Sequence, residues 1–145
     1  MSFDALAVAM AEADSGPIAA VPYAGLLGAE YRIDGDQVTL VAPFQKALIG
    51  TPSPARLHGG AVAGLMELAA TAQMIHALRE EETLPTIAPV NVTVDYLRGG
   101  QTETTYAAAR IVRMGRRIAN VNVEAWQEDR NRPIAAAHMN VMLKR

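Results

Sequence analysis

The chain has 145 residues and a mass of 15.5 kDa, which is the size of one domain. Half of the residues are hydrophobic, and the net charge of −2 argues against nucleic acid as the main partner. The absence of cysteine excludes a disulfide scaffold, a thiolate nucleophile and a cysteine-bound metal. We therefore expect a single domain over residues 1–145. A cytoplasmic location is expected because the first residues lack the basic region of a signal peptide.

The first third of the chain predicts one helix and one hairpin. Residues 3–13 have the pattern of a short amphipathic helix, which a Ser-Gly-Pro sequence ends. Residues 26–33 and 37–44 are predicted to be strands joined by an Asp-Gly-Asp turn. Residues 45–57 contain one glycine and two prolines, so we expect them to form a loop.

The most informative segment runs from His58 to Arg79, where nearly every residue is apolar. A helix that is apolar all round is predicted to be buried, and its polar residues argue against a membrane span. Glu67 lies in its middle, where a buried carboxylate is costly unless it is paired or used. Gly59 and Gly60 begin the helix, so their N–H groups can face developing negative charge. Such donors together with a carboxylate suit the hydrolysis of an acyl group.

The hydrophobic period changes from helical to two after this helix. Residues 86–98, 103–113, 117–127 and 133–143 are predicted to be four strands. Their short connections predict an antiparallel meander. With the earlier hairpin they give an α+β fold, in which a sheet of about six strands wraps one long central helix.

Three features together resemble the hotdog-fold acyl-CoA thioesterases, from roughly residue 24 to residue 143. They are Leu57-His58-Gly59-Gly60, an acidic residue nine positions after the histidine, and the segment Val92–Arg98. A turn containing Gly115 between two strands fits as well. The likeness is greatest to the branch of phenylacetate-degradation and hydroxybenzoyl-CoA thioesterases. The expected activity is therefore the hydrolysis of acyl-CoA to a free acid and CoA.

The resemblance implies a role for each catalytic candidate. Glu67 falls at the position of the catalytic acid, and Gly59 at that of the N–H donor to the thioester carbonyl. Whether Glu67 acts as a general base or as a nucleophile stays open. Thr71 falls where some members hold a hydroxyl that positions water, although a helical threonine commonly bonds its own helix. His58 is expected to hold the active-site loop through hydrogen bonds.

The same resemblance implies a binding site for substrate and CoA. Its expected residues are Gly60, Asn91, Tyr96, Arg113, Gly115, Arg116 and Arg117, with Arg56 and Arg98 as weaker candidates. The arginines suit the CoA phosphates, although a solvated hairpin tip would look the same in sequence. The chain departs from the family at Pro52, where members commonly carry Asn or Gln. Gln45 or Ser53 are candidate substitutes.

The resemblance further implies a homodimer, with tetramers common, in which two subunits build each site. Acyl-CoA is the expected partner, with no nucleic acid or membrane partner and no cofactor. No metal site is expected, because the histidines lack ligand spacing. Two alternatives remain. One is an acyl-CoA-binding hotdog protein without activity, which the proline at position 52 favours, and the other is a hotdog hydratase or dehydratase.

Overall fold

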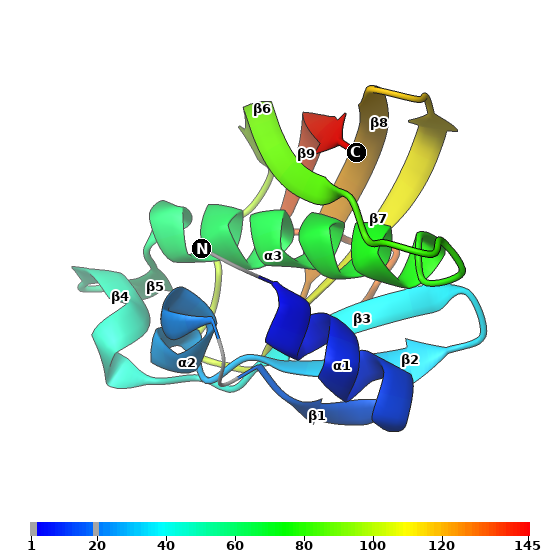
Figure 1. Ribbon diagram of the computed structural model, residues 1–145. Helices are drawn as coiled ribbons and strands as arrows, with labels where there is room; N and C mark the ends of the chain where they lie inside the picture. The colour runs from blue at the N-terminus through cyan, green and yellow to red at the C-terminus, as the bar shows by residue number, and fades with distance from the viewer. Residues whose placement is uncertain (1–2, 19–20) are drawn as a thin grey trace.

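A long helix lies inside a curled antiparallel sheet in the computed structural model, which describes residues 3–18 and 21–145 (Figure 1). In these residues the sheet has seven strands in the order β1-β2-β3-β7-β8-β9-β6. They are β1 Ser15–Pro17, β2 Glu30–Asp34, β3 Gln37–Ala42, β6 Thr86–Tyr96, β7 Thr105–Met114, β8 Ile118–Trp126 and β9 Ala135–Lys144. The predicted α+β hotdog architecture is confirmed, with one short strand, β1, more than expected.

The central helix is α3, Gly59–Ala77, which packs against β3, β7 and β8. The small alanine side chains allow the helix axis to lie close to the sheet. Met66 and Met74 fill the space between the helix and the sheet and have no exposed surface. The short N-terminal helix α1, Asp4–Glu12, packs on α3 through the buried side chains of Leu6 and Met10. In the described part of the chain, no helix is long and apolar enough to cross a membrane.

Two predictions for the N-terminal half need correction. Residues 22–27 form a helix that was not predicted, α2 Pro22–Leu27, and its last two residues fall within the strand expected at 26–33. Proline at the first position starts this helix, and Gly28 ends it in the left-handed conformation, with φ of 62°. The expected loop at 45–57 contains the 3₁₀ turn η1 Lys46–Leu48 and a hairpin of β4 Ile49–Pro52 and β5 Ala55–Leu57.

The last four strands form only part of the predicted meander. β7, β8 and β9 are consecutive antiparallel neighbours, but β6 pairs with β9 and not with β7. The segment between β6 and β7 instead crosses the N-terminal end of α3, where the Leu57 N–H donates to the Gly100 carbonyl at 3.0 Å. This crossing leaves β6 as an edge strand of the sheet.

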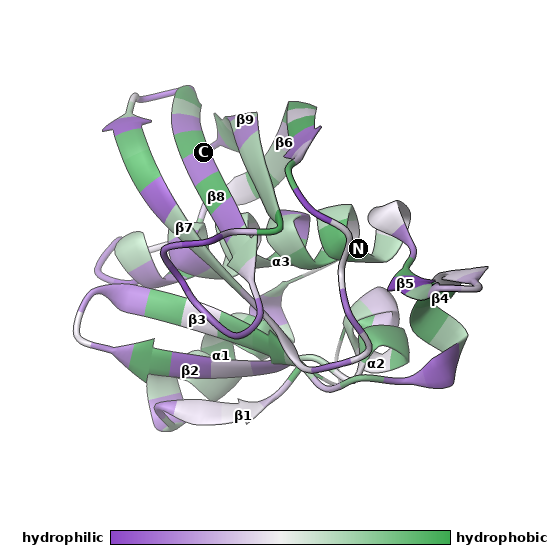
Figure 2. Ribbon diagram, turned by 180° about the vertical axis from the view of Figure 1, so that it is seen from behind, coloured by the Kyte–Doolittle hydropathy of each residue, from purple (hydrophilic) through white to green (hydrophobic). Residues whose placement is uncertain are grey.

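The edge strand β6 has an exposed apolar side. Seen from behind, polar and apolar residues alternate along the strands of the sheet (Figure 2). On β6 the exposed residues include Val90 at 55%, Val92 at 42% and Tyr96 at 57%, with Leu97 at 54% just beyond the strand. An unpaired strand edge beside large exposed apolar side chains is a typical protein–protein interaction surface.

Candidate active site

At the N-terminus of α3, one N–H group has no hydrogen-bond acceptor among the described residues. The Gly60 N–H donates to Nδ1 of His58 at 2.9 Å. The N–H groups of Ala61 and Val62 donate to the His58 carbonyl at 3.0 and 3.3 Å. Gly59 is the first helical residue, where the helix itself offers no acceptor. Of the first-turn donors, the Gly59 N–H is therefore the one available to a ligand.

His58 is held in the backbone hydrogen bonds around the helix start. It is the N-cap of α3, and its own N–H donates to the Leu48 carbonyl at 2.7 Å. Because Nδ1 accepts a hydrogen bond, the neutral ring carries its proton on Nε2. Gly50 packs directly against His58, since a Cβ at Gly50 would lie 2.8 Å from the His58 Cα. The histidine thus fastens η1 and the β4–β5 hairpin to the start of the helix.

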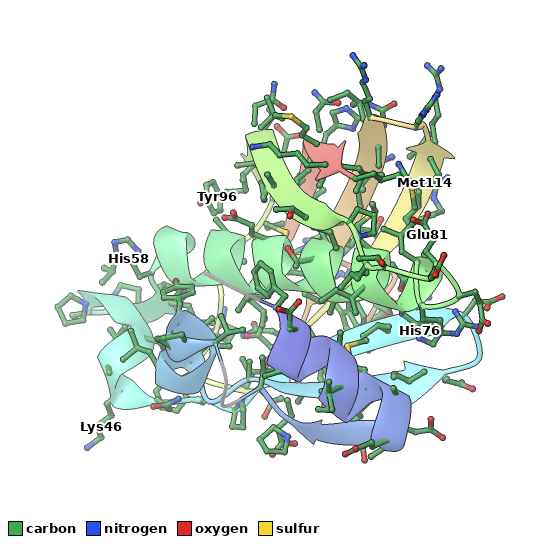
Figure 3. All side chains as sticks on the ribbon, in the orientation of Figure 1. Lys46, His58, His76, Glu81, Tyr96 and Met114 are labelled. Atoms are coloured by element: carbon green, nitrogen blue, oxygen red, sulfur yellow. The ribbon has the colours of Figure 1, made fainter. Side chains whose placement is uncertain are left out.

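Tyr96 closes one side of this helix start. Its hydroxyl donates to the Gly59 carbonyl at 2.9 Å, and a Cβ at Gly59 would lie 3.1 Å from its ring. Tyr96 and Gly59 also line a cavity of about 430 Å³, together with Leu57, Arg98 and several neighbours. The side chains of His58 and Tyr96 both lie at this end of α3 (Figure 3). The structure therefore brings together His58, Gly59, Gly60 and Tyr96 of the predicted set.

Glu67 is exposed in the single chain, and the prediction that it is buried is wrong. The reason is that α3 is covered by the sheet on one side only, while Gly60, Ala63 and Gly64 are at least partly open as well. Glu67 follows Gly59 by eight residues, or about 12 Å along the axis at a rise of about 1.5 Å per residue. The two groups of one chain therefore cannot both contact the same thioester.

Tyr23 of α2 is a neighbour of Glu67 that the sequence analysis missed. Its ring lies so close over Gly64 that a Cβ there would clash with it, and its hydroxyl donates to the Gly60 carbonyl at 3.4 Å. Burial raises the pKa of Tyr23, and the negative charge of Glu67 raises it further. The signal in the sequence was the spacing of Gly60 and Gly64, which puts both on one helix face and opens a slot for a ring.

Thr71 adopts the simpler of its two expected roles in this structure. Its hydroxyl donates to the Glu67 backbone carbonyl at 3.1 Å, four residues back in the helix. The side chain is 3% exposed. The hydroxyl is thus directed at its own helix and not at a water beside the Glu67 carboxylate.

The turn between β7 and β8 carries Arg116 and Arg117 and is called the arginine turn below. It lies at the opposite end of the molecule from Gly59. Arg145 donates to the Arg116 carbonyl and pairs with Glu81, which follows the C-terminal end of α3. The Leu143 N–H donates to the Arg117 carbonyl, so the turn is beside the start of β6. Tyr96 is at the other end of that strand, about 35 Å away at roughly 3.3 Å per residue. Within one chain, the predicted CoA-binding arginines and Gly59 are therefore not brought together.

Asn91 and Arg113 belong to one row across the sheet. The Asn120 amide donates to Asn140 at 2.6 Å, and the Asn140 amide donates to Asn91 at 2.9 Å. Arg113 of β7 is the register partner of Asn120. Asn91 is thus held by its neighbours in this chain. The arginines near the Gly59 cavity are the two weaker candidates, since Arg98 lines it and Arg56 packs against the adjacent Gly99.

The position at which family members commonly carry Asn or Gln lies in the β4–β5 hairpin of this chain. Pro52 ends β4 and is exposed, with Ser53 in the turn that follows. Gln45 is the N-cap of η1, and its amide donates to the Leu26 carbonyl at 3.4 Å. Neither candidate contacts Gly59 in the described structure. Among the described residues, no three His, Asp or Glu side chains group so as to hold a metal ion.

Comparison with known proteins decides the family. Residues 55–134, more than half of the chain, match the thioesterase superfamily. This chain belongs to the thioesterase superfamily. A Chromobacterium violaceum protein of known crystal structure is 36% identical, with 98% of this chain and 96% of that chain covered and a TM-score of 0.71. A Shewanella oneidensis protein related to the thioesterase superfamily is 27% identical over 86% of this chain and 88% of its own, with a TM-score of 0.75.

A curated relative has a stated activity. The medium/long-chain acyl-CoA thioesterase YigI of Escherichia coli K12 is 28% identical over 120 residues, with 75% of this chain and 77% of the relative covered. The family predicted from the sequence is thus confirmed, and with it thioester hydrolysis as the class of reaction. The matched region of the thioesterase superfamily contains both Gly59 and Glu67.

Proposed function

We propose that the protein is an acyl-CoA thioesterase whose sites are each built from two copies of the chain. The observation that carries this proposal is the unpaired Gly59 N–H at a cavity of about 430 Å³, with an exposed Glu67 on the same helix but out of reach. The Gly59 N–H of one protomer would donate to the thioester carbonyl oxygen, where negative charge develops. Glu67 of the second protomer would activate water or attack the carbonyl carbon.

The proposed reaction needs few groups besides the Gly59 N–H and the Glu67 carboxylate. When water or the Glu67 carboxylate adds to the carbonyl carbon, the Gly59 N–H stabilises the oxyanion. The carbon–sulfur bond then breaks, and CoA leaves as a thiolate. The thiolate takes up the proton that Glu67 removed from the attacking water, or a proton from solvent where the carboxylate attacked directly. If Glu67 attacks directly, water hydrolyses the resulting anhydride in a second step. Tyr23, whose ring packs over Gly64 three residues before Glu67 on α3, would form a wall beside the carboxylate.

The edge strand β6 supports a two-fold dimer as the working form. Pairing of two β6 strands would cover the exposed side chains of Val90 and Val92 and satisfy the free strand edges. An antiparallel pairing would put the Tyr96 end of one β6 beside the Thr86 end of the other. Within one chain, the arginine turn lies beside the Thr86 end of β6. Arg116 and Arg117 of the second protomer would therefore lie near Gly59 of the first protomer. That arrangement supports the predicted binding of the CoA nucleotide by these arginines.

The acyl group we propose is a medium or long aliphatic chain. The relative from Escherichia coli acts on medium/long-chain acyl-CoA. A second, narrow pocket of about 10 Å³ adjoins the Gly59 cavity; its walls are largely apolar, and Leu57 and Val62 line both. Leu27, Leu48 and Leu65 extend its apolar wall. An alkyl chain entering past Leu57 would have to widen this pocket, and it would then be buried among these side chains.

Release of thiol from a panel of acyl-CoAs tests the activity. We expect turnover of medium- and long-chain saturated substrates to exceed that of short-chain and aromatic ones. Failure to release thiol from any acyl-CoA would reject the enzyme and favour a binding protein without activity.

Mixed dimers test the shared site. One chain carries Glu67→Gln and the other carries Gly59→Pro, which removes a single N–H, and the mixed dimer is purified by two different tags. If the site is shared, one of the two sites keeps both groups, so about half of the wild-type activity returns although both parent dimers are inactive. If Gly59 and Glu67 of the same chain act together, the mixed dimer has no intact site and stays inactive.

A further inference from the structure

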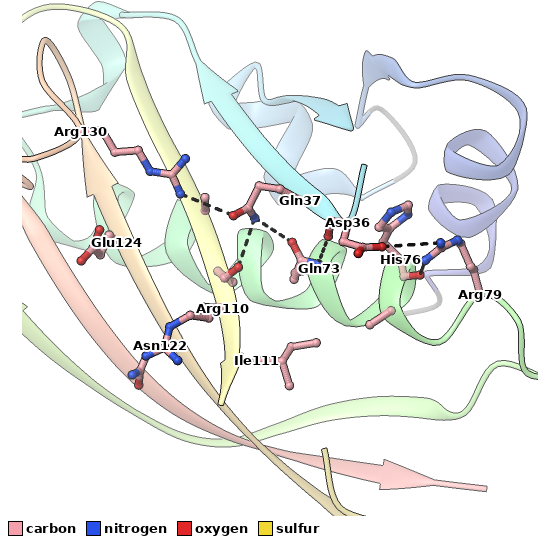
Figure 4. Close-up of a pocket in the computed structure, with 13 residues that line it drawn as sticks. Asp36, Gln37, Gln73, His76, Arg79, Arg110, Ile111, Asn122, Glu124 and Arg130 are labelled. Carbon is pink, nitrogen blue, oxygen red and sulfur yellow. Dashed lines mark hydrogen bonds and ion pairs between the residues drawn. The ribbon is translucent and has the colours of Figure 1, made fainter. Parts of the chain in front are cut away.

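The sheet is open between β3 and β7, and this opening is built into the structure. The two strands pair from Ala42 to Thr39 and then separate toward the β2–β3 turn. A cavity of about 650 Å³ lies there, with the C-terminal part of α3 as its floor (Figure 4). That volume is in the range of small-molecule sites. The floor residue His76 follows Gly59 by 17 residues, or about 25 Å along α3 at a rise of about 1.5 Å per residue.

Two glutamines hold the strands apart by replacing the missing ladder bonds. Gln73 of α3 accepts from the Val38 N–H at 2.9 Å and from the Gln37 amide at 2.9 Å. The Gln37 amide also donates to the Ala109 carbonyl of β7 at 3.2 Å. Gln73 is 7% exposed, so this amide needs partners, and it has them. The backbone groups of the opening are therefore satisfied without the strands having to close.

The walls of this cavity carry donors that are free to bind a ligand. Arg110 of β7 forms no hydrogen bond or ion pair with any described residue. Arg130 is fixed at the rim, because its guanidinium stacks over Trp126 at 4.6 Å and Trp126 in turn stacks on Tyr106. Its Nη2 makes a single long contact of 3.5 Å, to Gln37. A guanidinium that is already ordered loses little entropy when it binds an anion.

The charge of the walls defines the class of ligand. Three arginines line the cavity against two carboxylates, Asp36 and Glu124, although the whole chain has a net charge of −2. Asp36 lies 3.9 Å from Arg79, so Arg110, Arg130 and Glu124 are the charged lining residues without an ion pair among the described residues. An anion held by the arginines would thus also meet a carboxylate acceptor, which favours a ligand that carries a hydroxyl donor.

We propose that this cavity binds a small organic anion that carries phosphate or carboxylate groups and at least one hydroxyl, at a site separate from the thioester site. Arg110 and Arg130 would hold its anionic groups through charge-assisted hydrogen bonds. Glu124 would accept from its hydroxyl. The site thus gives the enzyme a place for an effector at the far end of α3 from Gly59.

Tryptophan fluorescence provides the test, because Trp126 is the only tryptophan of the chain and lies under the Arg130 guanidinium. The probes are citrate and adenosine diphosphate, which separate a carboxylate ligand from a phosphate ligand, and tricarballylate, which is citrate without its hydroxyl. Titrations use the wild type, Arg110→Gln, and Arg32→Gln as a matched exposed arginine on β2. Calorimetry on the same samples checks that fluorescence changes report binding.

We expect a saturable signal with citrate or adenosine diphosphate. Arg110→Gln should raise the dissociation constant about tenfold or more, because a charge-assisted contact is lost, while Arg32→Gln leaves it unchanged. If citrate binds, tricarballylate should bind more weakly. The Michaelis constant for acyl-CoA should be the same in Arg110→Gln and wild type. The proposal is overturned if neither probe binds at millimolar concentration, if both arginine variants bind alike, or if Arg110→Gln raises the Michaelis constant for acyl-CoA.

Discussion

Replacing Gly59 by proline removes one hydrogen-bond donor from α3 and little else. Proline is favoured at the first helical position, where its missing N–H has no helical partner. The preceding residue, His58, already has φ of −65° and ψ of 129°, the extended conformation that a following proline requires. The new ring meets Tyr96, whose nearest atom is 3.1 Å from the Cβ position. Gly59→Ala meets the same atom and keeps the N–H, so it is the matched control.

The expected loss follows from the hydrogen bonds of the first turn. The N–H groups of Gly60, Ala61 and Val62 all have acceptors in His58, so none of them is free to replace the deleted donor. Loss of a single oxyanion donor typically lowers kcat about 10²–10³-fold, or roughly 2.7–4 kcal/mol in the barrier. We expect Gly59→Pro to lose activity to this extent and Gly59→Ala to stay within a few-fold of wild type.

The assay is steady-state release of thiol from one acyl-CoA, with a thermal melt of each variant to confirm folding. The kcat should fall while KM changes little, because the oxyanion exists only as the transition state is approached. Equal kcat values for folded Gly59→Pro and Gly59→Ala would refute the role of this N–H. So would a loss in Gly59→Ala as large as that in Gly59→Pro, since the added Cβ and not the donor would then be responsible.

Three further predictions concern other parts of the chain. Glu67→Gln should lower kcat by about 10²-fold or more and leave the melting temperature unchanged, because the carboxylate is exposed in the protomer; near-normal kcat would exclude Glu67. Arg116→Ala with Arg117→Ala should raise KM for acyl-CoA about tenfold and spare an acyl-pantetheine, which lacks the nucleotide; equal effects on both substrates would show a structural role. Burial raises the pKa of Tyr31, and nearby carboxylates add to this effect, so the folded state holds that proton more tightly than the unfolded state. Its contribution to the free energy of unfolding should be complete below about pH 10 and be lost as the pH rises through the raised pKa. In denaturant titrations, the free energy of unfolding of Tyr31→Phe should therefore fall less steeply at alkaline pH than that of the wild type. At neutral pH the substitution should lower the free energy of unfolding by about 1–3 kcal/mol.

The sequence by itself predicted the long helix and the last four strands, and it pointed to the start of α3 as the candidate site. Apolar residues from His58 to Arg79 specify a long helix, because no other element buries so many consecutive apolar side chains. Alternation of period two located β6 to β9 to within a few residues. Two glycines at the helix start predicted N–H donors free for a ligand, but the Gly60 N–H donates to His58 and only that of Gly59 has no acceptor among the described residues. One carboxylate in an apolar helix pointed to Glu67 as the group to test.

The tertiary structure decided which of these groups can meet. Strand pairing depends on contacts between distant residues, so the sequence could not show that β6 pairs with β9 and remains an edge. Glu67 is exposed because the sheet covers only one side of α3, which the sequence pattern also could not show. Which N–H stays free depends on the rotamer of His58, which accepts from Gly60 and leaves Gly59 open. The arginine turn and Gly59 are at opposite ends of one chain, a separation that only the folded sheet imposes.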